Sequence, residues 1–170
     1  QIKKRESRRL STLTYRPIRI FLETVFFEAQ GNQNPNLIGK MPLLMSALKK
    51  AVNGMQGLIE VEDIGDTNLY SDLDMESLFK NNLIYQWSPI FDSTKNIQSD
   101  FLLLVKFDNN NQNPLPSGVL ASAIPITPEP ETNRPIIGLL TVSTETSFYT
   151  RGRISEYFSE VFLHEITHDL

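Results

Sequence analysis

The chain contains only two histidines, His164 and His168, four positions apart, and Glu165 directly follows the first. Residues i and i+4 of a helix lie one turn apart on the same face, so both imidazoles can direct a ring nitrogen at one cation. Zinc accepts such nitrogens at about 2.0–2.1 Å. This H-E-x-x-H pattern predicts a Zn²⁺ cofactor held by His164 and His168. Glu165 is then predicted to act as the general base on water that the zinc activates.

The amino-acid composition excludes several other kinds of site. The chain has 170 residues and no cysteine, so disulfide scaffolds, thiolate zinc sites and cysteine nucleophiles are excluded within this sequence. Hydrophobic residues make up 40% and charged residues 21%, values typical of a folded globular domain. A helix that carries two histidines without any metal remains the alternative interpretation of the motif.

The charge of the chain is unevenly distributed. Residues 1–14 hold five basic side chains and one acidic one, whereas the whole chain has a net charge of -4. A basic segment on an acidic body can contact nucleic acid or a membrane. No aromatic residues are interleaved with these basic residues, so we expect a flexible lead-in over residues 1–14 and no nucleic-acid partner.

Helical periodicity indicates how the motif is positioned. Apolar residues recur every three or four positions before the histidines, which predicts a helix over residues 154–170 that begins between Thr150 and Ser155. A second helix is predicted over residues 37–55, with Pro42 in its first turn and Gly57 ending it. The buried stripe of the helix over residues 154–170 is predicted to contain Ile154, Tyr157, Phe158, Val161 and Phe162.

Strands are predicted from short apolar or alternating runs at residues 17–27, 58–61, 101–107, 119–126 and 136–144. The opening order of strand, helix and strand predicts parallel pairing of the first two strands. The short connections between the later strands predict at least one antiparallel pair. Residues 62–100 are acidic and polar, and we expect an irregular insertion there. The predicted fold class is α/β, with helices against a mixed sheet.

Four stretches of the sequence resemble one known family. They are YRPIRI at residues 15–20, DFLLLV at residues 100–105, VLASA followed by NRPIIG at residues 119–123 and 133–138, and FLHEITH at residues 162–168. Together they resemble the leishmanolysin family of zinc metallopeptidases, within the metzincin group. The resemblance covers about residues 15–170, and residues 64–99 match poorly.

The resemblance implies a metzincin-like twisted mixed sheet with a backing helix and an active-site helix. It implies that residues 15–170 are the N-terminal part of a metallopeptidase catalytic domain, truncated after the H-E-x-x-H helix. The third zinc ligand and a methionine-bearing turn are expected beyond Leu170. The implied activity is that of a zinc-dependent metalloendopeptidase acting on peptides or proteins. The implied location is extracellular or at the cell surface, with possible membrane association through regions outside this segment.

The same resemblance implies a substrate-binding strand, which is expected to border the cleft and to pair with extended peptide. An unpaired strand edge can accept a peptide as an added strand, and small side chains would let the peptide backbone approach. The residues of this predicted substrate strand are Val119, Leu120, Ala121, Ser122 and Ala123.

The sequence also departs from the family, which usually carries several cysteines in this half. A catalytically silent leishmanolysin-like protein that works in cell adhesion or binding is therefore the alternative function, and a structural domain with a chance motif is a third. Asp169 follows the second histidine. We expect its side chain to face solvent or to end the helix, without binding metal.

Overall fold

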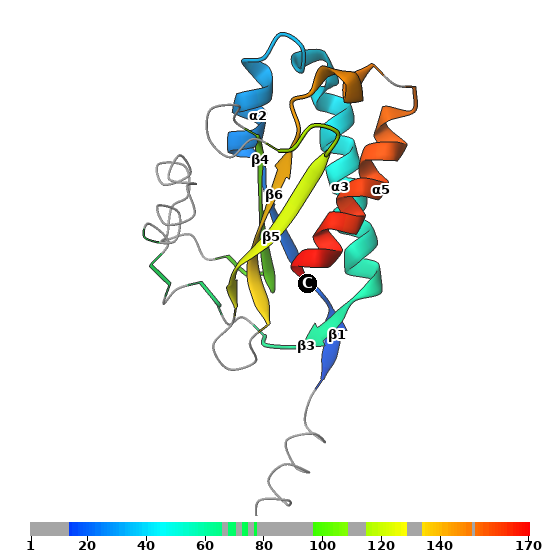
Figure 1. Cartoon of the computed structure of the whole chain (residues 1–170). Helices are drawn as coiled ribbons and strands as arrows, with labels where there is room; N and C mark the ends of the chain where they lie inside the picture. The colour runs from blue at the N-terminus through cyan, green and yellow to red at the C-terminus, as the bar shows by residue number, and fades with distance from the viewer. Residues whose placement is uncertain are drawn as a thin grey trace, which may run out of the picture.

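The structure is a computed structural model of the chain, and it describes residues 14–65, 68–70, 73–74, 77, 97–108, 115–128, 134–150 and 152–170. The described residues form a mixed α/β fold with a mixed sheet and three α-helices (Figure 1). This confirms the predicted α/β class. Apart from Thr14, the expected lead-in lies outside the described residues, as does most of the expected insertion at residues 62–100.

The main sheet has four strands in the order β2-β4-β6-β5. The strands β2 (Ile20–Glu23), β4 (Phe101–Phe107) and β6 (Pro135–Val142) run parallel, and β5 (Ala121–Pro128) pairs antiparallel with β6. The predicted antiparallel pair is therefore confirmed. β5 lies at the edge of the sheet, and its outer side has no strand partner among the described residues.

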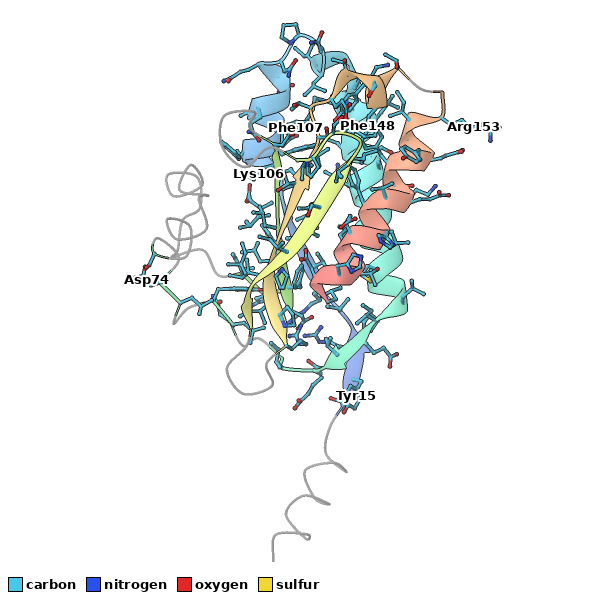
Figure 2. The ribbon with its side chains drawn as sticks, viewed as in Figure 1. Tyr15, Asp74, Lys106, Phe107, Phe148 and Arg153 are labelled. Carbon is cyan, nitrogen blue, oxygen red and sulfur yellow. The ribbon has the colours of Figure 1, made fainter. Side chains whose placement is uncertain are left out.

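Strand β4 is apolar because both faces of the sheet are covered. All its residues are buried except Lys106, which is half-buried. The side chains of Lys106 and Phe107, labelled in Figure 2, leave opposite faces of the strand because successive side chains alternate. This double coverage explains why the segment reads as a nearly continuous apolar run.

Two long helices lie side by side on one face of the sheet, as Figure 1 shows. They are α3 (Met41–Leu58) and α5 (Ile154–Asp169), and both predicted helices are thus confirmed. A short 3-10 helix, η1 (Ile38–Lys40), precedes α3, and Pro42 stands in the first turn of α3 as expected. Gly57 does not end α3, because the helix runs on to Leu58.

The prediction of one strand over residues 17–27 is wrong. Only β2 belongs to the main sheet, and residues Val25–Asn32 form the helix α2. The backbone N–H of Glu28 donates to the carbonyl of Thr24 at 2.8 Å, which closes the first helical turn. The helix turns Phe27 into the core, where its ring stacks on Phe107 with the centroids 4.3 Å apart. Tertiary packing thus overrides the local β preference of this apolar run.

The predicted parallel pairing of the first two strands is also wrong. β1 (Tyr15–Pro17) and β3 (Glu60–Glu62) form a separate antiparallel pair. The segment that follows α3 lies beside the N-terminal segment. The N–H of Ile18 donates to the carbonyl of Ile59 at 2.9 Å. The parallel partner of β2 is instead β4, which follows much later in the chain.

The other face of the sheet is covered by residues from the segment 62–100, which was expected to be an irregular insertion. Tyr70 and Ile97 are buried there, and the Tyr70 hydroxyl donates to the carbonyl of Ile136 at 3.1 Å. They pack on the side chains of β4 and β6 that point away from α3 and α5. Among the described residues, no helix combines the length and apolar character needed to span a membrane.

A buried ion pair joins the two-stranded sheet to the main sheet. The Asp100 side chain is fully buried, and it accepts hydrogen bonds from Nη1 and Nη2 of Arg16 at 2.6 and 2.8 Å. It also accepts one from the backbone N–H of Arg19 at 2.8 Å. Burial by itself would raise the pKa of Asp100, but the hydrogen bonds from Arg16 and Arg19 outweigh it and hold this pKa below its usual value.

The first prediction concerns this ion pair. Arg16→Ala leaves Asp100 buried beside β4 without its main partner, and such a change typically costs about 3 kcal/mol or more. We expect the free energy of unfolding, measured by urea denaturation, to fall by about that amount. Lys49→Ala, at an exposed position of α3, is the control and should change it by less than about 0.5 kcal/mol. Equal losses in both variants would contradict the anchoring role of Arg16.

Candidate functional site

Helix α5 has one buried face and one exposed face. It begins at Ile154, inside the predicted window, and it buries Phe158, Phe162 and Ile166 against the core. A helical period of 3.6 residues places His164 and His168 outside this apolar face, and both are exposed. Figure 2 labels Arg153, the residue directly before the first turn of α5.

The predicted metal ligands and base lie close together at the end of α5. The Nε2 atoms of His164 and His168 are 3.1 Å apart, and their rings stand at 83° to each other. Glu165 is half-buried, and one ligand atom from each of the three residues lies within 4.8 Å of the others. Two nitrogens bound to one tetrahedral zinc lie roughly 3.3 Å apart. The donor set and its spacing therefore fit such an ion, although these imidazoles supply only two of the three protein ligands usual for catalytic zinc.

A shallow pocket of about 370 Å³ opens beside this cluster. One wall is the exposed side of α5, which contributes both His164 and Glu165, and the other is the segment that leads into β5. Gly118, with φ of 83°, occupies the third position of a turn in which Val119 N–H donates to the Pro116 carbonyl at 3.0 Å. The full lining is Gly118, Val119, Leu120, Ala121, Tyr157, Glu160, Val161, His164 and Glu165.

The predicted substrate strand only partly overlaps this pocket. Val119 and Leu120 precede β5, which begins at Ala121, and these three residues line the pocket. Ser122 and Ala123 lie further along β5 and are half-buried, but they are not part of the lining. Their role in binding substrate stays a prediction.

Some pocket residues were missed or misplaced by the sequence prediction. Tyr157 is exposed and Val161 is half-buried, so they do not belong to the fully buried stripe, although Phe158 does. Glu160 was not predicted at all. Helical spacing could have identified Tyr157 and Glu160. Tyr157, Glu160 and His164 are three and four positions apart, so they lie on the same face of the helix as the histidines.

Asp169 ends the helix, which is one of the two expected alternatives, and its side chain does not face solvent. It is the last residue of α5, but its side chain is fully buried, and neither carboxyl oxygen has a hydrogen-bond partner within the described structure. The carboxyl packs against Gly138 of β6, where a Cβ atom would come within 2.5 Å of Oδ2. Burial, with a smaller contribution from the charge of Glu165, raises the pKa of Asp169 to about 7.

Comparisons with protein-family models, with curated proteins and with solved structures found no match for this chain. The cluster at His164, Glu165 and His168 and the pocket beside it are therefore the features of the chain that bear on its function.

The second prediction follows from the buried carboxyl of Asp169. Its pKa is about 7 in the folded chain and near 3.8 for an exposed aspartate, so the folded state holds the extra proton between these values. Stability should therefore fall as the pH rises from about 4 to 7, by on the order of 4 kcal/mol. Asp169→Asn carries no charge and should be more stable than the unmodified chain at pH 8, with the difference shrinking as the pH falls to 4.

Thermal or urea unfolding at several pH values measures this difference. Glu60→Gln removes one acidic charge at an exposed position of β3 and should follow the pH profile of the unmodified chain. If Asp169→Asn also follows that profile, the Asp169 carboxyl gains its proton no more easily in the folded chain than in the unfolded one, and the pH argument fails.

Proposed function

We propose that this chain is the N-terminal part of the catalytic domain of a zinc-dependent metalloendopeptidase related to the leishmanolysin family. The single observation that carries the proposal is the clustering of His164, Glu165 and His168, whose ligand atoms lie within 4.8 Å of one another. Two of them, His164 and Glu165, also line a pocket. A coordinating pair with an adjacent carboxylate supplies two metal ligands and the general base that hydrolysis by metal-activated water uses.

The arrangement of the elements supports the proposal. An edge strand, β5, lies next to the helix that carries the cluster, and a second helix, α3, packs behind it. This agrees with the metzincin-like plan of a mixed sheet, a backing helix and an active-site helix. The likeness is one of layout, and the family assignment is part of the proposal.

The side chains of the cluster divide the chemistry between them. Zinc, when bound, supplies the Lewis acidity that makes water a nucleophile at neutral pH. His164 and His168 would hold the metal through Nε2, and Glu165 would take a proton from the attacking water and pass it to the leaving amine. Glu165 is half-buried, which keeps its carboxylate in contact with both water and the pocket.

The outer edge of β5, which has no strand partner among the described residues, supplies a place for the peptide. Strand pairing aligns an extended substrate by backbone hydrogen bonds alone, so many sequences can bind. In this proposal Val119, Leu120, Ala121, Ser122 and Ala123 form the binding strand. The full-length polypeptide would work outside the cell or at its surface, attached through regions beyond this segment if it associates with a membrane.

One departure from the family favours a second function. The family usually carries several cysteines in this half, and this sequence has none. A leishmanolysin-like protein that binds peptides or mediates adhesion without cleaving them would need the strand edge and the pocket but no complete metal site.

The third prediction concerns zinc affinity. Residues 1–170 should bind Zn²⁺ weakly in calorimetry, because two imidazoles leave the rest of the coordination sphere to water. His164→Ala and His168→Ala should each weaken binding further, by at least about tenfold, since even the loss of a supporting group near a metal has that effect. Tight binding that survives either substitution would place the ion away from this pair.

The fourth prediction tests the mechanism in the full-length polypeptide. Glu165→Gln keeps the length of the side chain but removes its charge and basicity. Zinc content should stay unchanged, and cleavage of an unstructured peptide should fall by about 10²–10⁴-fold, which is the usual contribution of a general base. Glu156→Gln, at an exposed position nine residues earlier in α5 and outside the pocket, is the matched control.

The outcomes separate the two functions. Near-normal cleavage by Glu165→Gln at full zinc content would show that another group is the base. A zinc-loaded, unmodified polypeptide that binds peptide and never cleaves it would favour the binding protein over the peptidase.

A further inference from the structure

A second pocket lies beyond the N-terminal end of α5, whereas the histidines lie near the C-terminal end of that helix. It has a volume of about 470 Å³ and lies between the segment that leads into α3 and the segment that leads into α5. The latter segment contains the short 3-10 helix η3 (Thr146–Tyr149). Figure 1 shows both segments at the same end of the molecule. The pocket is lined by Asn36, Lys40, Thr146, Tyr149 and Thr150.

The lining of this second pocket is polar. Each of its five described residues carries a hydrogen-bonding side chain, whereas Val119, Leu120 and Val161 line the pocket beside the histidines. None of the five is acidic, and Lys40 is the only charged residue among them. These residues therefore offer a bound molecule several hydrogen bonds and one positive charge.

Three of the lining side chains have their polar groups available. Within the described structure, Lys40 forms no ion pair, and the side chains of Asn36 and Thr146 form no hydrogen bond. Asn36 and Thr146 come from opposite sides of the pocket, more than 100 positions apart in the sequence. A molecule between the two segments can therefore be contacted from both sides.

The positive charge of Lys40 has no counter-charge nearby in the chain. Residues 29–59 contain no acidic residue. Glu145 directly precedes η3, but its carboxylate accepts a hydrogen bond from the N–H of Gly118 at 3.1 Å, so it is directed toward the turn before β5. Because Lys40 is half-buried, an anion bound beside it would replace part of the hydration that its ammonium group lacks.

The other two lining residues are held in place by contacts of their own. The ring of the buried Tyr149 stacks on Phe158 with the centroids 5.3 Å apart, and its hydroxyl donates to the carbonyl of Ser143. The Thr150 hydroxyl donates to the carbonyl of Ser147 at 3.1 Å and can still accept a hydrogen bond. Binding would not have to order these side chains, which lowers its entropic cost.

These features match one class of small molecule. Sugar hydroxyls donate and accept hydrogen bonds, as do the amide of Asn36 and the hydroxyl of Thr146. The single ammonium group of Lys40 suits one phosphate or carboxylate group. The volume corresponds to roughly 15 water molecules, which exceeds what a lone phosphate needs and is enough for a sugar ring with one acidic group.

We propose that this second pocket binds an acidic monosaccharide, that is, a hexose carrying one phosphate or carboxylate group. Lys40 contacts the acidic group, and Asn36 and Thr146 contact the ring hydroxyls. His164 follows Ile154, the first residue of α5, by ten positions, which is roughly 15 Å along the helix. The site is therefore separate from the histidine cluster, and the inference does not depend on zinc binding or on peptidase activity.

The test is an NMR chemical-shift titration of residues 1–170. Metal is first removed with a chelator and dialysis, so that no probe can bind through an ion at the histidines. The probes are glucose 6-phosphate, glucuronate, glucose and inorganic phosphate at equal ionic strength. Glucose lacks the acidic group, and phosphate lacks the ring.

At least one of the two acidic sugars should bind with a Kd on the order of 1 mM. It should bind about fivefold more tightly than glucose, because an accessible ion pair contributes up to about that factor. It should also bind more tightly than inorganic phosphate, which cannot contact Asn36 and Thr146 in the same way. The shifted resonances should include those of residues 36–40 and 146–150.

Three variants separate the contacts from folding. Lys40→Gln should lower the affinity for the acidic sugar to that for glucose, and Thr146→Val should weaken both sugars by about threefold to fivefold without changing the binding of phosphate. Lys49→Gln loses the same charge at an exposed position of α3 outside the pocket, and it should bind like the unmodified chain. The dispersion of each spectrum verifies that the variant is folded.

The inference is overturned if neither acidic sugar binds, or if glucose or inorganic phosphate binds as tightly as the acidic sugars. It is also overturned if Lys40→Gln and Lys49→Gln lose affinity equally, because the attraction would then come from the overall charge of the surface. Shifts confined to residues outside 36–40 and 146–150 would place the sugar elsewhere and reject this pocket.

Discussion

The packing of α5 against α3 and the sheet is the constraint on which the rest of the candidate site depends. Phe158, Phe162 and Ile166 are fully buried, so the rotation of the helix about its axis is fixed. Once that rotation is set, the 3.6-residue period decides which residues face outward. The spacing of four residues brings the imidazoles of His164 and His168 together, and the buried residues of α5 keep that pair on the outward face of the helix.

The strand order places β5 at the edge of the sheet, next to α5 and its exposed face. β5 is the only described strand of the main sheet that runs antiparallel, and it lies at the edge next to α5. The turn at Gly118 then leads Val119 and Leu120 into the pocket wall. The proposed metal ligands, the proposed base and the edge strand thus come from two segments more than 35 positions apart in the sequence, and sheet order brings them together.

Much of this could be predicted from the sequence because the signals are local. The helix with the H-E-x-x-H motif, the helix α3 and the strand β4 were predicted from periodicity and apolar runs. The opening of the chain was not, because β1, β2 and α2 are short and their pairing is decided by distant partners. The Arg16–Asp100 ion pair joins residues 84 positions apart, and no local pattern indicates which of the 16 basic residues meets which of the 20 acidic ones.

The burial of Asp169 could not be predicted from the sequence either, and it affects which carboxylate can be assigned as the general base. Glu165 and Asp169 are one turn apart in α5, and sequence alone offers both as carboxylates beside the histidines. Asp169 is sealed against Gly138, whereas Glu165 is half-buried at the rim of the pocket. A carboxyl that is buried away from the pocket cannot reach a substrate or the water that attacks it, and two neighbouring carboxylates in unlike environments take unlike roles. The burial of Asp169 therefore leaves Glu165 as the carboxylate of this turn that can serve as the base, which supports the proposed mechanism.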